Sequence, residues 1–215
     1  MRIGRTQLDE SEAWLLLHVY RQDAVIYFDF AGNLPALDPQ PDDLLTLADF
    51  GRILALGVEL DAGRVSRALI AAVSANWGGV PHQLRLRDAD PSIDPQLLDR
   101  VTELYTHFRY RYGLGAPLAL AILHLRRPYL VPLFTDALFV FYAPLASEIA
   151  HEFHSSTPMF WESIRRDLVF NRDEMNRLRV RLTTDPDEYS RALSKLSDVR
   201  LHCIIAQQMV DSSGV

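Results

Sequence analysis

The segment Gly113-Leu114-Gly115 carries residue types that can bind an anion. Glycine tolerates positive φ, so two glycines one residue apart predict a tight bend between two helices. The first N–H groups of the following helix, which we expect to start near Ala116, have no partner within that helix, and with the helix dipole they favour a phosphate group. The alternative is structural: the glycines end one helix and begin the next without binding anything.

A stretch without acidic residues surrounds this bend. No aspartate or glutamate lies between Glu103 and Asp136, although the formal net charge of the chain is −6. Guanidinium groups make bidentate contacts to phosphate, so a locally basic window in an acidic protein indicates an anion-facing surface. The arginines within the window are Arg109, Arg111, Arg126 and Arg127.

Both pairs of arginines also have a structural interpretation. Arg126 and Arg127 lie at the end of the helix that we expect after the bend, where positive charge complements the helix dipole. Arg109 and Arg111 alternate with aromatic residues over 108–112, a mixture that is typical of nucleic-acid surfaces. On a helix, however, most of these aromatic residues face the core, which leaves Tyr110 and the arginines outside.

Asp136 is the candidate catalytic residue. An acid that follows Thr135 at a helix start is favourable near the helix dipole, with or without a chemical role. Other chemistries have little support. Lys195 is the only lysine, which confines Schiff-base chemistry to that side chain or the terminal amine, and the single Cys203 excludes internal disulfides and multi-cysteine zinc sites. No P-loop, nucleophile elbow, dinucleotide fingerprint or zinc-protease histidine spacing is present, so we expect neither a cofactor nor a metal.

The stretch 104–142 resembles the helix-hairpin-helix element of the DNA glycosylase superfamily. In that element a Gly-apolar-Gly turn is followed by a helix, a proline-bearing loop and an aspartate. The corresponding residues here are Gly113-Leu114-Gly115, Ala119, Pro128, Pro132 and Asp136. The resemblance implies that a hairpin over residues 95–143 grips the DNA backbone and that Asp136 supports departure of a base. Pro117 stands where bifunctional glycosylases keep a Schiff-base lysine, so the implied reaction is monofunctional.

The segment Leu-Arg-Arg-Pro-Tyr-Leu-Val-Pro over 125–132 is similar to a segment of an uncharacterised bacterial family of all-helical proteins. Residues 45–60 and 193–205 also look like recurring blocks of that family, so the likeness covers much of the chain. The family has no established activity, and the resemblance therefore implies an all-helical fold alone. Its pattern places an aspartate where this chain has Thr135, one residue before Asp136.

Helix-capping residues and helix-ending residues recur along the chain, and the helices that they delimit must position these candidate residues. We expect a mainly α fold, a single multi-helix bundle over residues 1–215 with a soft seam near 154–158 and eight or nine helices. Only residues 24–30 look like a strand, which limits the fold to at most one short β segment, and residues 33–45 and 82–92 are typical of loops. Capping residues predict helix starts at Asp9, Thr46, Asp61, Asp94, Thr157 and Asp185, the last three each followed by proline.

Composition sets the class of protein. The chain has 215 residues, of which 48% are hydrophobic and 23% charged, as in ordinary soluble globular domains. No apolar run approaches the roughly 20 residues that span a bilayer, and the N-terminal residues lack the apolar core of a signal peptide. We therefore expect a cytoplasmic protein without a membrane partner.

Three functions are compatible with these observations. The first is a helix-hairpin-helix-like protein that binds DNA or another polyanion through residues 113–127, without robust catalysis. The second is a non-enzymatic scaffold or homodimer that buries the aromatic segment 139–142 against a protein partner. The third is a monofunctional base-excising enzyme in which Asp136 stabilises a developing oxocarbenium ion.

Overall fold

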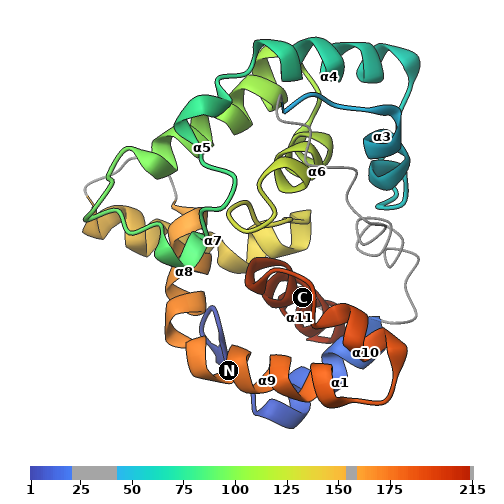
Figure 1. Ribbon diagram of the computed structural model, residues 1–215. Coiled ribbons are helices and arrows are strands. Elements are labelled where there is room, and N and C mark those ends of the chain that lie inside the picture. The colour runs from blue at the N-terminus through green and yellow to red at the C-terminus, as the bar shows by residue number, and fades with distance from the viewer. Residues whose placement is uncertain (21–42, 154–158, 214–215) are drawn as a thin grey trace.

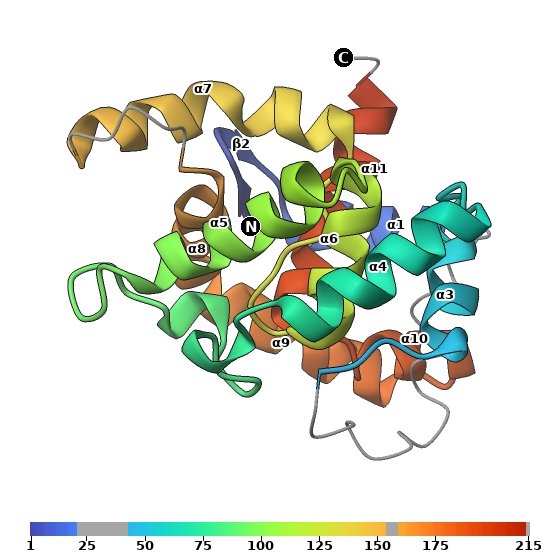
Figure 2. The ribbon, with the colours of Figure 1, turned by 90° about the horizontal axis from the view of Figure 1, so that it is seen from above.

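Two groups of helices pack around two buried helices, α6 (Ala116–Arg126) and α11 (Asp198–Ser213), in the computed structural model of the chain (Figure 1). The structure describes residues 1–20, 43–153 and 159–213. Figure 1 shows α3, α4 and α5 around α6, and α1, α9 and α10 around α11 on the opposite side. Viewed from above, α7 lies along one edge of the molecule (Figure 2). The expected mainly helical architecture is confirmed.

The remaining helices have the following bounds. They are α1 (Glu10–Tyr20), α3 (Leu47–Leu54), α4 (Ala62–Ser74), α5 (Leu97–Thr106), α7 (Asp136–Glu152), α8 (Phe160–Phe170), α9 (Arg172–Thr184) and α10 (Glu188–Leu193), with the short turns η1 (Trp77–Gly79), η2 (Leu86–Asp88) and η3 (His107–Arg111). The expected seam at 154–158 and the helix start at Thr157 lie outside the described residues. No helix in the described ranges is both long and apolar enough to cross a bilayer.

A small hairpin at the N-terminus is the β structure of the described residues. Strands β1 (Arg2–Ile3) and β2 (Thr6–Gln7) pair antiparallel, with Ile3 opposite Thr6. Gly4 forms the turn at a φ of 58°, which glycine adopts without steric cost. The strand that we expected over 24–30 lies outside the described residues.

Local capping signals located several helix starts correctly. Thr46 caps α3 in a reciprocal capping box with Asp49, and Asp61 caps α4 by accepting the N–H of Arg64. Thr135 caps α7, so that Asp136 is its first residue. Each cap joins residues three positions apart, and the chain can therefore form it without distant partners.

Two predicted helix starts were wrong by two residues or more. α5 begins at Leu97, because Asp94 turns the preceding chain by accepting the N–H of Gln96 and also pairs with Arg100. α10 begins at residue 188 and is capped by Asp187, since Asp185 accepts the N–H of Asp187 instead of opening the helix.

We expected the helix that precedes the glycine bend to continue as an α-helix to Tyr112. It ends earlier, at Thr106. Residues 107–111 form a π-helical turn, in which the N–H of Tyr112 donates to the carbonyl of His107 at 3.2 Å. Contacts with α4 fix both ends of this turn: His107 Nε2 donates to the Ala71 carbonyl at 3.0 Å, and the Tyr112 hydroxyl lies 2.8 Å from the Ser74 hydroxyl. π turns are rare and occur mostly at single sites within α-helices.

Apolar side chains from both groups of helices form one continuous core. In α6 every residue from Leu118 to His124 is buried, and α11 is buried over 199–206. At the centre, the Tyr142 hydroxyl donates to Asp167 at 2.9 Å and lies 2.9 Å from His202 Nε2. This network ties α7, α8 and α11 together, and burial beside Asp167 holds the pKa of the Tyr142 phenol well above its ordinary value.

Candidate functional site

The glycine bend lies at the surface, between the π turn and α6. Gly113 and Gly115 are exposed and adopt φ angles of 62° and 79°, and a Cβ at either position would contact nothing within 4 Å. Leu114 between them is buried and its N–H donates to the Phe108 carbonyl, which anchors the bend to the core. No side chain caps the start of α6 at Gly115. The backbone of the bend therefore faces outward, as the sequence indicated.

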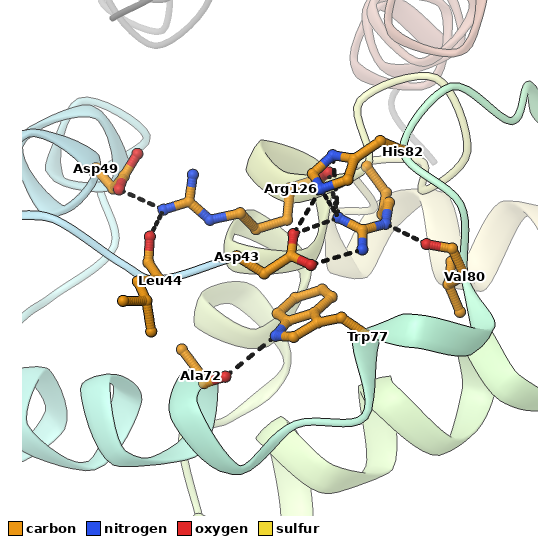
Figure 3. A network of polar contacts seen from close by, with 9 residues as sticks. Asp43, Leu44, Asp49, Ala72, Trp77, Val80, His82 and Arg126 are labelled. Atoms are coloured by element: carbon orange, nitrogen blue, oxygen red, sulfur yellow. Dashed lines mark hydrogen bonds and ion pairs between the residues drawn. The ribbon is translucent and has the colours of Figure 1, made fainter. Parts of the chain in front are cut away.

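Arg126 does not point toward this bend. Its guanidinium donates to Asp49 Oδ2 at 2.6 Å and to the backbone carbonyl of Leu44 (Figure 3). Asp49 is also the N3 residue of the capping box at the start of α3, where Thr46 is the N-cap. Arg126 therefore fastens the end of α6 to the start of α3.

Arg127 is more deeply enclosed, with only 2% of its surface exposed. Its Nη1 and Nη2 donate to the two carboxylate oxygens of Asp43 at 2.6 and 3.0 Å, and its Nε donates to the Val80 carbonyl at 2.5 Å. The guanidinium also lies over the ring of Trp77 at 5.0 Å, and His82 shares the Asp43 carboxylate at 2.8 Å. Both arginines at the end of α6 thus form ion pairs with carboxylates of the same chain.

Arg109 and Arg111 have different surroundings. Arg109 donates from Nη1 to the Tyr105 hydroxyl at 2.6 Å, and its guanidinium lies 4.7 Å from the centre of the Tyr110 ring. The Tyr110 side chain is 65% exposed. Arg111 is exposed, and its guanidinium has no hydrogen bond or ion pair with any described residue. The π turn thus presents an exposed aromatic ring with one guanidinium against it, and a second exposed arginine follows in the sequence, next to the bend.

Asp136 lies beside the bend as well. It is exposed at the start of α7, and it lines a cavity of about 600 Å³ together with Gly115. Burial raises the pKa of Tyr105, and the nearby charges of Tyr110 and Asp136 raise it further, while Arg109 lowers it. Gly115 and Asp136 therefore line the same cavity.

The wall of this cavity is apolar and its rim is polar. Leu118 and Phe139 belong to the apolar wall, and Arg64, Gln207 and Asp211 bring polar groups to the opening. These polar residues were missed by the sequence analysis because they come from α4 and α11, distant in the sequence from the bend. A concave apolar site with a few polar groups is the usual form of a small-ligand pocket.

The aromatic segment 139–142 is directed largely into its own chain. Phe139 stacks on Phe134 with ring centres 4.7 Å apart, and Tyr142 is fully buried. Phe141 packs against Gly4 of the N-terminal hairpin. Val140 alone within this segment is mostly exposed, at 67%.

Among the described residues, no group of three or more His, Cys, Asp or Glu side chains could hold a metal ion. Comparisons of the chain with protein-family models, curated proteins and solved structures found no match. The site must therefore be interpreted from its own geometry.

Proposed function

We propose that this protein binds nucleic acid through the surface formed by Arg109, Tyr110, Arg111 and the bend over 113–115. The observation that carries the proposal is the exposed Tyr110 ring, with the Arg109 guanidinium stacked on it and the neighbouring Arg111 guanidinium unpaired among the described residues. Arginines that neutralise phosphates supply most of the affinity for nucleic acid, and exposed aromatic rings stack on unpaired bases.

The exposed backbone of the bend would add neutral N–H donors to this surface, except at Pro117, which has no N–H, and at Leu114, whose N–H already donates to the Phe108 carbonyl. The start of α6 carries no side-chain cap, and the two glycines leave room for close approach of a phosphate. Arg126 and Arg127 have no part in the proposed surface, since Asp49 and Asp43 already compensate their charges. The proposed surface is thus smaller than the 113–127 segment expected from the sequence and is shifted toward the π turn.

Binding of a fluorescent single-stranded oligonucleotide, followed by anisotropy at low and moderate salt, tests this proposal. We expect the double variant Arg109→Gln/Arg111→Gln to weaken binding and to reduce the salt slope by about 0.7 for each lost phosphate contact. Tyr110→Ala should weaken single-stranded binding more than duplex binding, because stacking needs an unpaired base.

A charge-matched control is the double variant Arg172→Gln/Arg191→Gln. Both arginines are exposed on α9 and α10, on the side of the molecule opposite to α5 (Figure 1). The control should bind nearly as well as the wild type. No binding by the wild type at low salt, or equal losses in the two double variants, would refute the proposal.

The cavity beside the bend favours a second candidate function, the removal of a base from nucleic acid. A base turned out of the strand would enter between Leu118 and Phe139, and Asp136 at the rim would stabilise positive charge on the sugar. In this reaction the N-glycosidic bond breaks and the base leaves with the bonding electrons. Water then adds to C1′ of the sugar, and the proton that it loses balances the proton taken up by the departing base.

A base-release assay on duplexes with damaged bases tests this second candidate. Asp136→Asn should reduce release by about 100-fold or more while oligonucleotide binding persists. Asp211→Asn, at another part of the same rim, is the control and should retain release. Release that survives Asp136→Asn removes Asp136 from this role, and a wild type that releases no base removes the reaction itself.

A further inference from the structure

A second concave site lies on another part of the molecule, between η2, α9 and the start of α11. It is a cleft of about 360 Å³, and it shares no residue with the cavity beside the bend. Its volume is at the lower end of the range for small-molecule sites, which run from about 300 to 1,000 Å³. The cleft is therefore sized for a compact ligand.

Positive charge dominates the lining of this cleft. Arg85, Arg87, Arg179 and Lys195 all contribute to it, and Asp198 is the single acid among the lining residues. A concave surface with one sign of charge focuses the electrostatic field and concentrates ions of the opposite sign. This excess of cations occurs in a chain whose formal net charge is −6.

Asp198 arranges two of these cations. Its Oδ2 accepts from Arg87 Nη1 at 3.0 Å, and its Oδ1 accepts from Arg179 Nη2 at 2.5 Å. Arg179 also donates to the Ser194 carbonyl, and Arg87 lies 3.6 Å from Asp88, which is more exposed and is not part of the lining. One carboxylate of the cleft thus holds two guanidinium groups side by side, so their positions are fixed before a ligand arrives.

Arg85 and Lys195 supply charge that nothing in the described chain compensates. Both side chains are exposed, and neither has a hydrogen bond or an ion pair with a described residue. Lys195 is the only lysine of the protein. Tyr129, which follows the Arg-Arg-Pro segment and is 39% exposed, adds a ring with a hydroxyl, and Asn176 adds an amide.

We propose that this cleft binds the phosphate groups of a small phosphorylated molecule, with a pyrophosphate-type group as the element that is recognised. Arg87 and Arg179, which Asp198 holds in place, would offer only their remaining N–H groups, and Arg85 and Lys195 would supply the uncompensated charge that contacts the other phosphate oxygens. The ligand is a small molecule because the cleft is short and concave, whereas nucleic-acid strands follow extended grooves. The site is separate from the surface of the proposed function and does not depend on it.

Isothermal titration calorimetry of the whole protein with inorganic pyrophosphate at low salt tests the proposal, with orthophosphate as a weaker reference ligand. We expect saturable binding of pyrophosphate by the wild type. Arg85→Gln and Lys195→Gln should each raise the Kd several-fold, and the double variant should raise it by about tenfold or more.

Arg67→Gln is the matched control for each single variant, because it also removes one exposed positive charge. Arg67 lies on α4, on the opposite side of the molecule from α9 (Figure 1), and should leave the Kd within about twofold of the wild type. Thermal unfolding of all variants without ligand should coincide with that of the wild type, since the changed side chains are exposed.

Three outcomes would overturn the proposal. The first is no pyrophosphate binding by the wild type at the lowest salt. The second is an equal loss in Arg67→Gln and the cleft variants, which would indicate unspecific attraction. The third is that the Arg85→Gln and Lys195→Gln variants weaken oligonucleotide binding and leave pyrophosphate binding unchanged, which would make the cleft part of a nucleic-acid surface. Oligonucleotide binding that fails in every variant and in the wild type, with pyrophosphate binding intact, would refute the proposed function and leave this proposal standing.

Discussion

Asp43 and Arg127 form a bidentate ion pair across 84 positions of the sequence, with Oδ1–Nη1 and Oδ2–Nη2 distances of 2.6 and 3.0 Å. Arg127 is nearly fully enclosed, and its remaining Nε–H is used by Val80. This ion pair joins the end of α6 to the segment before α3 (Figure 3). Arg127, which the sequence offered as a ligand-binding residue, therefore stabilises the fold.

Removal of one partner from this pair should destabilise the protein strongly. Arg127→Gln and Asp43→Asn each leave an uncompensated charge in a buried place, and we expect the free energy of unfolding to fall by about 3–5 kcal/mol. Urea unfolding followed by circular dichroism measures the change. The exposed Arg191→Gln serves as the control, and a loss of less than about 1 kcal/mol in both pair variants would contradict the structural role.

The burial of α6 leads to a second prediction. Leu120 and Leu123 are fully buried, so Leu120→Ala or Leu123→Ala should cost about 2–5 kcal/mol through lost burial and the cavity that remains. Leu47→Ala, at a position that is 82% exposed on α3, should change stability by less than about 0.5 kcal/mol. Equal effects at the buried and the exposed positions would mean that α6 is not a core helix.

The glycine bend leads to a third prediction, which concerns the backbone alone. Gly113→Ala and Gly115→Ala place a Cβ in the left-handed region without any steric contact, and each should cost about 1–2 kcal/mol. Gly51→Ala provides the opposite case, because Gly51 lies within α3 with equally free space, and it should stabilise by about 0.5–1 kcal/mol. Chemical denaturation of the three variants compares the signs, and stabilisation at either bend position would contradict the argument.

A fourth prediction concerns pH. Burial lowers the pKa of His202 below its ordinary value of 6.5, with the charge of Arg2 acting in the same direction and that of Asp167 opposing it. The unfolded chain therefore takes up a proton below about pH 6.5 that the folded protein resists, so the free energy of unfolding falls as the pH decreases from there toward the lowered pKa. Urea unfolding at pH 7.5 and pH 5.5 should show this loss.

The control for this pH effect is His202→Gln, which cannot titrate. The variant loses stability at both pH values because the contact with Tyr142 changes, and the informative quantity is therefore the difference between the two pH values. That difference should be smaller than in the wild type by up to about 1.4 kcal/mol per pH unit. The same pH dependence in both proteins would rule out His202 as its source.

Sequence reasoning was most successful where one short segment contains the whole interaction. The caps at Thr46, Asp61 and Thr135 join residues three positions apart, and the structure contains all three. The same reasoning misplaced the starts of α5 and α10. Before α10, Asp185 and Asp187 could each cap the helix, and before α5 Asp94 forms a turn instead of a cap. In both places the local sequence is compatible with more than one helix start.

The candidate site around the bend shows the same contrast between local features, which the sequence predicts, and long-range contacts, which it does not. The bend itself was predictable, because the preference of glycine for positive φ is a local property. The occupation of Arg126 and Arg127 was not, because Asp49 and Asp43 lie about 80 positions earlier in the chain. The basic cleft was also invisible, since its cations come from η2, α9 and the loop before α11 and no short segment contains them together.

Local sequence patterns specify the helical class, the bend at 113–115 and the basic character of the stretch around it. These follow from backbone preference, side-chain periodicity and charge, which act over a few residues. The tertiary structure decided which arginines keep their charge available for a ligand. That choice depends on which carboxylates the packing of α3, α6, α9 and α11 brings within hydrogen-bond distance, and an ion pair has no preferred separation along the chain.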